Sequence, residues 1–249
     1  MKIIKIGGGR RLGVCVRAVE EWAKGGDAPC DTLIILPIPT TRDGLTVNGT
    51  GATMNEISGL ARGGVAIAGY GIPSSVRKRA EELGAMVYDA SLDEDFLLEN
   101  ARITAHGALG RILTEAERDL SDLSIGVIGY GRIGSALSEL LLFLGASVRI
   151  FSGSEEKIMA LASLGADVRS LDDGDFYGLD ILVNTAPQRL ISVAAEKELL
   201  GRGVRIIELA SGKNFSSDEV CVMSSIPDKM YPISSGRMYA KHIIKSLSR

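Results

Sequence analysis

The chain contains 249 residues, carries a formal net charge of −3 and is 45% hydrophobic, with 30 glycines and few aromatic residues. This length can bury a sizeable core as one large domain or two small ones. The small net charge argues against nucleic acid or an acidic membrane as a partner.

The cysteines and the apolar runs argue against a disulfide-rich, zinc-binding, secreted or membrane-spanning protein. Cys15, Cys30 and Cys221 are too widely spaced for a disulfide framework or a zinc site, so we expect reduced thiols, with Cys15 buried in a helix, and no metal. The first apolar run meets glycine at once, which predicts a strand rather than a signal peptide. No apolar run is long enough to span a membrane, so we expect a soluble, cytoplasmic protein.

Strand and helix patterns alternate along the first half of the chain. Short aliphatic runs that end at glycine or proline predict buried parallel strands, and apolar residues at helical spacing predict the helices between them. The strands are expected at residues 2–9, 32–36, 63–71 and 86–91, and the helices at 11–24 and 73–85. This order predicts an α/β fold with right-handed crossovers.

A long helix is expected from Asp93 to about Leu120, where it could bridge two domains. It carries His106, whose ordinary pKa of about 6.5 suits a general acid or base, although a lone histidine on a helix is more often structural. The last helix follows a proline-containing loop, and Ser234 or Ser235 is expected to cap it. His242 on this helix is expected at the surface.

The second half repeats the alternation and contains a dinucleotide-binding fingerprint. Gly129, Gly131 and Gly134 form G-x-G-x-x-G between a continuous apolar strand and a helix. The first glycine permits the tight turn, the second lets a pyrophosphate approach the backbone, and the third lets helix and strand pack closely. The loop residues Tyr130, Arg132 and Ile133 would complete the site. The alternative is a glycine turn in a Rossmann-like domain that binds no nucleotide.

The end of the next strand discriminates between the two nicotinamide cofactors. An acidic residue there would bind the ribose of NAD, but the strand ends in Phe151 and Ser152 without an acid. Ser152, Ser154 and Lys157 could accept the 2′-phosphate of NADP. Ser154 could also simply cap the following helix. We therefore predict NADP over NAD.

Three loops at the carboxyl ends of predicted strands offer further polar groups, and ligands of doubly wound sheets bind at such ends. The second of these loops is expected beside the nicotinamide. In chain order the groups are Thr40, Thr41 and Arg42, then Asn184, Thr185 and Ala186, then Ser211 and Lys213.

Several segments together resemble one enzyme family across nearly the whole chain. The most specific pieces are "DTLIILPIPTTRDG", "IIELASGKNF" and "IPDKMYPISSGRMYAKHI". Their order is similar to that of the A subunit of dipicolinate synthase and, more loosely, of the D-isomer-specific 2-hydroxyacid dehydrogenases. The segment between Trp22 and Thr32 lacks a strand that the family has, and Gly153 and Gly212 stand where the family tends to carry arginine.

The resemblance implies a fold and a reaction. The fold would be a central Rossmann doubly wound parallel sheet in residues 104–234, with a smaller flavodoxin/Rossmann-like α/β domain in residues 1–103, joined by the C-terminal helix 235–249. The reaction would be NADP-dependent oxidation of a dihydro- or tetrahydropyridine dicarboxylate to dipicolinate, as in sporulation. A flavoprotein-like second subunit would be a partner, and we expect a homo-oligomer.

Such a dicarboxylate needs cations and hydroxyls. Arg42 could hold one carboxylate in bidentate fashion and Lys213 the other. Lys213 and His106 are the candidate catalytic residues. Besides Arg42, the residues that could contribute to substrate binding are Thr40, Thr41, Ser211, Ser234 and Ser235. The alternative for each charge is a solvated loop. Two other functions stay open, namely a D-2-hydroxyacid dehydrogenase-like enzyme and a non-catalytic nucleotide-sensing Rossmann protein.

Overall fold

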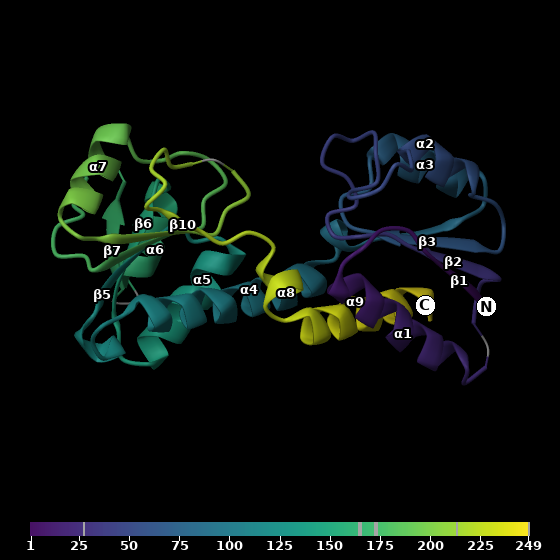
Figure 1. Cartoon of the computed structure of the whole chain (residues 1–249), viewed down its shortest axis with the longest axis horizontal. Helices are drawn as coiled ribbons and strands as arrows, with labels where there is room; N and C mark the ends of the chain where they lie inside the picture. Colours follow the sequence, from purple (N-terminus) through teal and green to yellow (C-terminus); the bar gives the residue numbers. More distant parts are fainter. Residues whose placement is uncertain (27, 164–165, 172–173, 213, 249) are drawn as a thin grey trace. The chain divides into compact units, whose positions relative to one another are not determined.

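The chain folds into two compact units (Figure 1). The computed structural model describes all residues except 27, 164–165, 172–173, 213 and 249. Unit 1 comprises Met1–Asn100 and Pro227–Arg249, and unit 2 comprises Ala101–Ile226. Both units carry a parallel sheet flanked by helices, so the predicted α/β fold class is confirmed.

Unit 1 contains a four-stranded parallel sheet in the order β1-β2-β3-β4. Helices α1 and α9 cover one face of this sheet, and α2 and α3 cover the other (Figure 1). The strands are β1 (Lys2–Lys5), β2 (Thr32–Ile35), β3 (Val65–Gly69) and β4 (Met86–Asp89), and the helices are α1 (Arg10–Ala23), α2 (Met54–Gly59), α3 (Ser74–Glu82), α9 (Pro232–Leu247) and the start of α4 (Glu94–Glu115).

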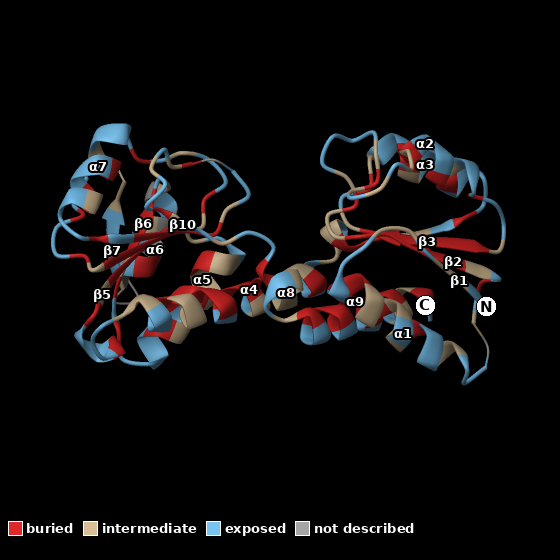
Figure 2. Cartoon of the chain, viewed as in Figure 1, coloured by how far each residue is buried: buried red, intermediate tan, exposed pale blue. Residues whose placement is uncertain are grey.

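The described residues between α1 and β2 form no strand, as the sequence suggests for this segment. As a result β1 is one edge of the sheet and β4 is the other. The two inner strands carry the core, because aliphatic side chains on both faces of β2 and β3 are buried, as Figure 2 shows for β3. Cys15 is fully buried beneath them, and burial raises the pKa of its thiol to about 12.

The C-terminal helix α9 packs against α1, although the two are far apart in the sequence. It begins at Pro232, with Tyr231 at the preceding position and no side-chain cap, so the prediction that Ser234 or Ser235 caps it was wrong. Proline at the first helical position is already favourable because its missing N–H needs no partner there. Ser235 instead lies inside the helix, fully buried, and its hydroxyl donates to the Pro227 carbonyl over 2.6 Å.

His242 is buried, not exposed as the sequence analysis expected. Its Nδ1 lies 2.9 Å from a carboxylate oxygen of Asp93, and its Nε2 lies 3.3 Å from Glu99. Burial alone would raise the pKa of Asp93, but hydrogen bonds from His242, the Phe96 N–H and the Tyr88 hydroxyl hold that pKa below its ordinary value. The histidine therefore ties α9 to the start of α4.

Replacing His242 with leucine is expected to lower the free energy of unfolding by about 2 kcal/mol, because Asp93 and Glu99 each lose their partly buried contact with the imidazole ring. The pKa of Asp93 is depressed in the folded state, so its contribution is present above the ordinary value of 3.8 and is lost as the pH falls. Urea unfolding at pH 3 to 7 should show a weaker acid dependence in the variant.

The matched control for this prediction is Lys245→Leu on the same helix. It breaks only the exposed Lys245–Asp95 pair and should change the free energy of unfolding by less than about 0.5 kcal/mol. Equal effects of the two substitutions would contradict the structural role given to His242.

Unit 2 contains a six-stranded parallel sheet in the order β10-β9-β8-β5-β6-β7. From β5 the chain continues through β6 to β7 at one edge of the sheet. It then crosses to β8 on the other side of β5 and continues toward the opposite edge, so the strand order reverses between β5 and β8. The strands are β5 (Ser124–Ile128), β6 (Ser147–Ser152), β7 (Asp167–Ser170), β8 (Ile181–Asn184), β9 (Arg205–Glu208) and β10 (Cys221–Val222), and the helices are α5 (Arg132–Phe143), α6 (Glu155–Ser163), α7 (Val193–Gly201) and the end of α4. This is the order of a doubly wound dinucleotide-binding sheet.

Close packing in the centre of this sheet depends on Gly126 of β5. A Cβ atom there would lie 2.7 Å from the Leu179 side chain and 3.0 Å from the ring of Phe151. The missing side chain thus makes room for Phe151, which is fully buried and packs against the tilted ring of Phe176 at 4.7 Å between ring centroids.

The helices of the described residues are either too short or too polar to cross a lipid bilayer.

Candidate functional site

The glycine-rich loop of unit 2 connects β5 to α5 at the point where the strand order reverses. Gly129 has a φ of +89°, which an L side chain rarely adopts, and its N–H donates to the Phe151 carbonyl over 2.9 Å. Gly134 faces the same turn, and a Cβ atom there would lie 2.1 Å from the Gly129 carbonyl oxygen. Two of the three fingerprint glycines are therefore required by the fold itself.

Gly131 is different, because nothing in the fold requires glycine at that position. Its φ of −90° is open to any residue, and a Cβ atom there would meet no atom within 4 Å. It occupies the N-cap position of α5, where no side chain caps the first turn. Serine or aspartate would cap that turn better. The space beside Gly131 and the N–H groups of the first turn together form an anion cradle.

Polar side chains from β8 line the same edge of the sheet. Thr185 donates its hydroxyl to the Ile128 carbonyl over 2.9 Å, which fixes the end of β8 to the glycine loop. Asn184 is buried, and its Nδ2 lies 3.0 Å from Oε1 of Glu208 and 3.0 Å from the Ala186 carbonyl oxygen. The predicted residues Asn184, Thr185 and Ala186 are thus brought beside the fingerprint.

Glu208 lies at the same edge of the sheet and was not predicted from the sequence. It ends β9, is 1% exposed, and accepts a hydrogen bond from the Ala210 N–H over 2.7 Å. Burial raises the pKa of this carboxyl group, and hydrogen bonds from Asn184, Ala210 and Asn214 offset only part of that effect. The acid joins the loop after β8 to the loop after β9. The only signal in the sequence is an acid at the end of an aliphatic strand.

The end of β6 lies next to the glycine loop, as expected for the cofactor-discriminating position. Ser152 is buried, and its hydroxyl oxygen accepts a hydrogen bond from the Ser154 N–H over 3.1 Å. Ser154 immediately precedes α6, so it occupies the capping position as well. A Cβ atom at Gly153, between them, would meet no atom within 4 Å. The side chain of Lys157 lies outside the described residues.

In unit 1, the loop after β2 is organised by Asp43. Its carboxylate accepts hydrogen bonds from the N–H and hydroxyl of Thr46, the N–H of Leu45 and the hydroxyl of Thr41, and these bonds hold the pKa of Asp43 well below its ordinary value. Thr41 is therefore used within the loop. Arg42 is exposed.

Thr40 was predicted to bind substrate, but it is fully buried and engaged on both sides. Its hydroxyl donates to the Pro37 carbonyl over 3.2 Å and accepts a hydrogen bond from the Tyr70 N–H over 2.7 Å. The structure thus assigns Thr40 to joining the ends of β2 and β3. The hydroxyl of Ser235 is likewise occupied by the Pro227 carbonyl, so neither residue offers a free hydroxyl to a ligand.

The remaining predicted residues lie on different elements of the chain. Ser211 is exposed in the loop after β9, His106 is exposed on α4, and Ser234 is exposed on α9. Lys213 lies outside the described residues. Within the described part of the chain, no three His, Cys, Asp or Glu side chains are arranged to hold a metal ion.

Unit 1 contains a buried cation that sequence reasoning did not single out. Arg11 follows the glycines after β1, is 6% exposed, and donates from one terminal nitrogen to Asn100 over 3.0 Å. Its Nε has no hydrogen-bond partner among the described residues, and its guanidinium lies over the Phe96 ring. Burial lowers the pKa of Arg11 to about 10, so the group keeps its charge at neutral pH.

Comparison with known proteins places the fold among dehydrogenase-like structures. No protein-family model matches the chain, and no curated protein matches it by sequence. The chain is similar to the A subunit of dipicolinate synthase from Bacillus halodurans, with a TM-score of 0.76, 16% identity and coverage of 100% of this chain and 98% of that one. The corresponding protein of Bacillus subtilis gives 0.74 at 17% identity, covering 100% and 96%.

A more distant likeness is to a D-isomer specific 2-hydroxyacid dehydrogenase from Lactobacillus delbrueckii ssp. bulgaricus, solved with NAD. It gives a TM-score of 0.51 at 12% identity, covering 100% of this chain and 96% of that one. The resemblance inferred from the sequence is therefore confirmed at the level of the fold.

Proposed function

We propose that this protein is a nicotinamide-dependent oxidoreductase that binds its cofactor at the carboxyl edge of the unit 2 sheet. The observation that carries this proposal is Gly131, a glycine with ordinary backbone angles and empty surroundings at the start of a helix. Folding does not need glycine there, whereas a pyrophosphate that approaches the backbone does. When bound, the nicotinamide ring would accept a hydride from the substrate.

The residues of unit 2 would orient that ring without taking part in the hydride transfer. The loop after β8 lies beside the glycine loop, held by Thr185, so its backbone groups would bind and align the nicotinamide amide. Glu208 and Asn184 would keep this loop in place. Because these groups are tied to one another before any ligand arrives, the site would be preorganised.

We propose a cyclic dicarboxylate as the substrate and unit 1 as the domain that binds it. The fold likeness to dipicolinate synthase supports this choice. Two cations of unit 1 support it as well, because Arg11 follows the glycines after β1 and Arg42 lies in the loop after β2. A direct test is to supply a dihydropyridine dicarboxylate with oxidised NADP, with and without a flavoprotein-like second subunit, because the loss of one hydride to the cofactor and of one proton to solvent converts this ring into the pyridine. Formation of a product with pyridine dicarboxylate absorbance supports the proposal. Cofactor binding without turnover would instead favour a nucleotide sensor.

We further propose NADP as the preferred cofactor, because Ser152, Gly153 and Ser154 place no carboxylate at the end of β6. Calorimetry should give a dissociation constant for NADP at least about tenfold below that for NAD. Gly153→Asp should weaken NADP binding by at least about tenfold, since the new carboxylate would repel the 2′-phosphate. It should not weaken NAD binding, since a carboxylate there can accept a hydrogen bond from the ribose hydroxyl.

Gly153→Arg is the matched counterpart, because the same open position then carries a cation. It should strengthen NADP binding and leave NAD binding unchanged. If both substitutions alter the two affinities in parallel, the end of β6 does not contact the ribose phosphate and the cofactor assignment fails.

A further inference from the structure

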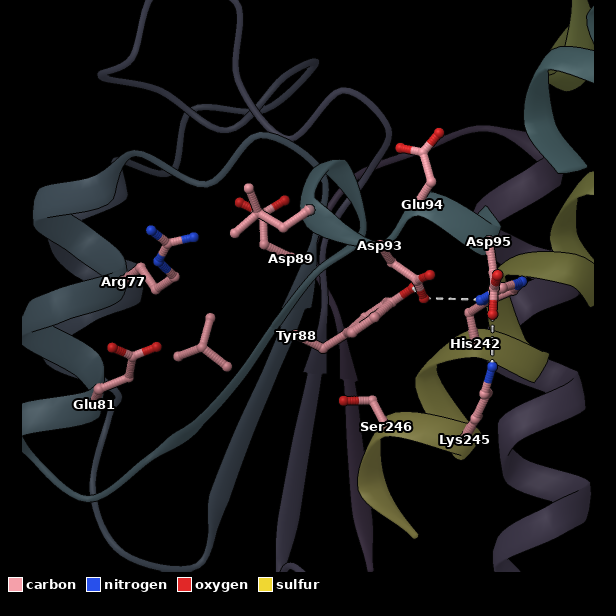
Figure 3. Close-up of a pocket in the computed structure, with 12 residues that line it drawn as sticks. Arg77, Glu81, Tyr88, Asp89, Asp93, Glu94, Asp95, His242, Lys245 and Ser246 are labelled. Carbon is pink, nitrogen blue, oxygen red and sulfur yellow. Dashed lines mark hydrogen bonds and ion pairs between the residues drawn. The ribbon is translucent and has the colours of Figure 1, made fainter. Parts of the chain in front are cut away.

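A groove of about 720 Å³ runs along the outer edge of β4 in unit 1 (Figure 3). Helix α3 forms one wall, with Arg77 and Glu81 directed into the groove, and α9 forms the other wall with His242 and Lys245. The floor carries Tyr88 of β4. The groove therefore lies where another strand would add to the sheet.

The edge of β4 is open to pairing, whereas the opposite edge of the same sheet is protected. β4 is hydrogen-bonded to β3 on one side only and presents Met86, which is 38% exposed. β1, at the other edge, carries the exposed lysines Lys2 and Lys5 in its four residues. Lysines on an edge strand are a common device against edge-to-edge pairing, and β4 has none.

The wall formed by α3 carries charges of opposite sign one helical turn apart. Arg77 and Glu81 are in positions to pair with each other, yet neither forms an ion pair within the described residues. Arg79 and Glu82 on the same helix lie outside the groove and do pair, at 3.9 Å. The two groove charges are thus available to a partner whose charges run in the opposite order.

We propose that a second copy of this chain occupies the groove, with β4 of the two copies pairing antiparallel about a two-fold axis. Such an interface is isologous, so each contact between the two copies occurs twice, with the roles of the two copies exchanged. The axis would set Arg77 against the partner's Glu81, and Glu81 against the partner's Arg77. Paired strands lie about 4.8 Å apart, which brings the two α3 helices near enough for these long side chains to meet.

The self-complementary charge order favours a second copy over an unrelated peptide. A helix that carries Arg77 and Glu81 one turn apart is matched in both charges by its own antiparallel image. The added strand pairing would join the two four-stranded sheets into one of eight strands. It would also cover Met86 and the exposed Leu92 beside the groove.

The experiment is sedimentation equilibrium on the full chain, from low micromolar to about 200 µM. The wild type is expected to dimerise. Arg77→Glu and Glu81→Arg should each weaken dimerisation at least about tenfold, because each sets like charges against each other twice. The double variant R77E/E81R should recover wild-type dimerisation. The matched control R79E/E82R reverses the outward-facing pair on the same helix and should leave dimerisation unchanged.

Mixing the two single variants gives a second readout that misfolding cannot mimic. R77E supplies two negative charges and E81R two positive ones, so an equimolar mixture should form a heterodimer about as readily as the wild type dimerises. A wild type that stays monomeric overturns the proposal. So does a dimer that is insensitive to single reversals, or a mixture that stays as weak as its components.

Discussion

Replacing Gly134 with alanine is expected to lower the free energy of unfolding by about 3 kcal/mol and to abolish dinucleotide binding. The added Cβ would lie 2.1 Å from the Gly129 carbonyl oxygen and 3.0 Å from the Thr185 hydroxyl. The first of these is a backbone atom, so no side-chain rotation relieves the clash. Helix α5 must move away from β5, and the cradle at the helix start is lost. Urea unfolding and calorimetry with NADP measure the two effects.

Gly131→Ala is the control that separates folding from binding. Its Cβ meets nothing within 4 Å, so the free energy of unfolding should change by less than about 0.5 kcal/mol. The methyl group would nevertheless stand where the pyrophosphate approaches, and the affinity should fall by about 100-fold, equivalent to about 2.7 kcal/mol. Unchanged affinity in a stable Gly131→Ala protein would contradict the proposed cofactor site.

Glu208→Ala is expected to lower the free energy of unfolding by about 3 kcal/mol, because it leaves buried donors unpaired. At the carboxyl edge of the sheet the Ala210 N–H loses its acceptor, and the Asn184 amide keeps only the Ala186 carbonyl. The two loops that they fix should loosen, so cofactor affinity should fall as well. Glu208→Gln keeps one acceptor oxygen and should cost clearly less than alanine. Equal losses of unfolding free energy for the two substitutions would contradict the stabilising role given to these hydrogen bonds.

The same residue gives a pH dependence whose sign follows from burial. The pKa of Glu208 is raised in the folded protein above its ordinary value of 4.5, so the folded state holds the proton more tightly than the unfolded state. Its contribution to stability is complete below the ordinary value and declines as the pH rises through the folded pKa. The glutamine of Glu208→Gln cannot titrate. The difference in unfolding free energy between the wild type and this variant should therefore change as the pH rises from the ordinary pKa through the folded-state pKa.

The fold and the fingerprint could be predicted because their signals are local. A continuous aliphatic strand, a glycine turn and a helix lie together in residues 124–143, and this stretch forms β5, the loop and α5. The family resemblance also predicted that a strand is missing between Trp22 and Thr32, and the described residues of that segment form none.

The errors came from contacts between distant segments. His242 lies on an amphipathic helix and was expected at the surface, but Asp93 and Glu99, about 145 positions earlier, meet its ring. Thr40 belongs to a polar loop, and only the neighbouring strand end at Tyr70 shows that its hydroxyl is occupied. Glu208 was overlooked because its partner Asn184 becomes its neighbour only through strand pairing. Side-chain periodicity carries no information on such partners.

The discontinuity of unit 1 has a consequence for the order in which the chain can fold during synthesis. Helix α1 packs on α9, and the Arg11 N–H donates to Asp228, 217 positions later. Every residue of unit 2 therefore leaves the ribosome before unit 1 can be completed. At ordinary translation rates the buried face of α1 waits on the order of ten seconds for its partner helix. Unit 2 is thus free to fold first, and the first hundred residues depend on the last twenty-three.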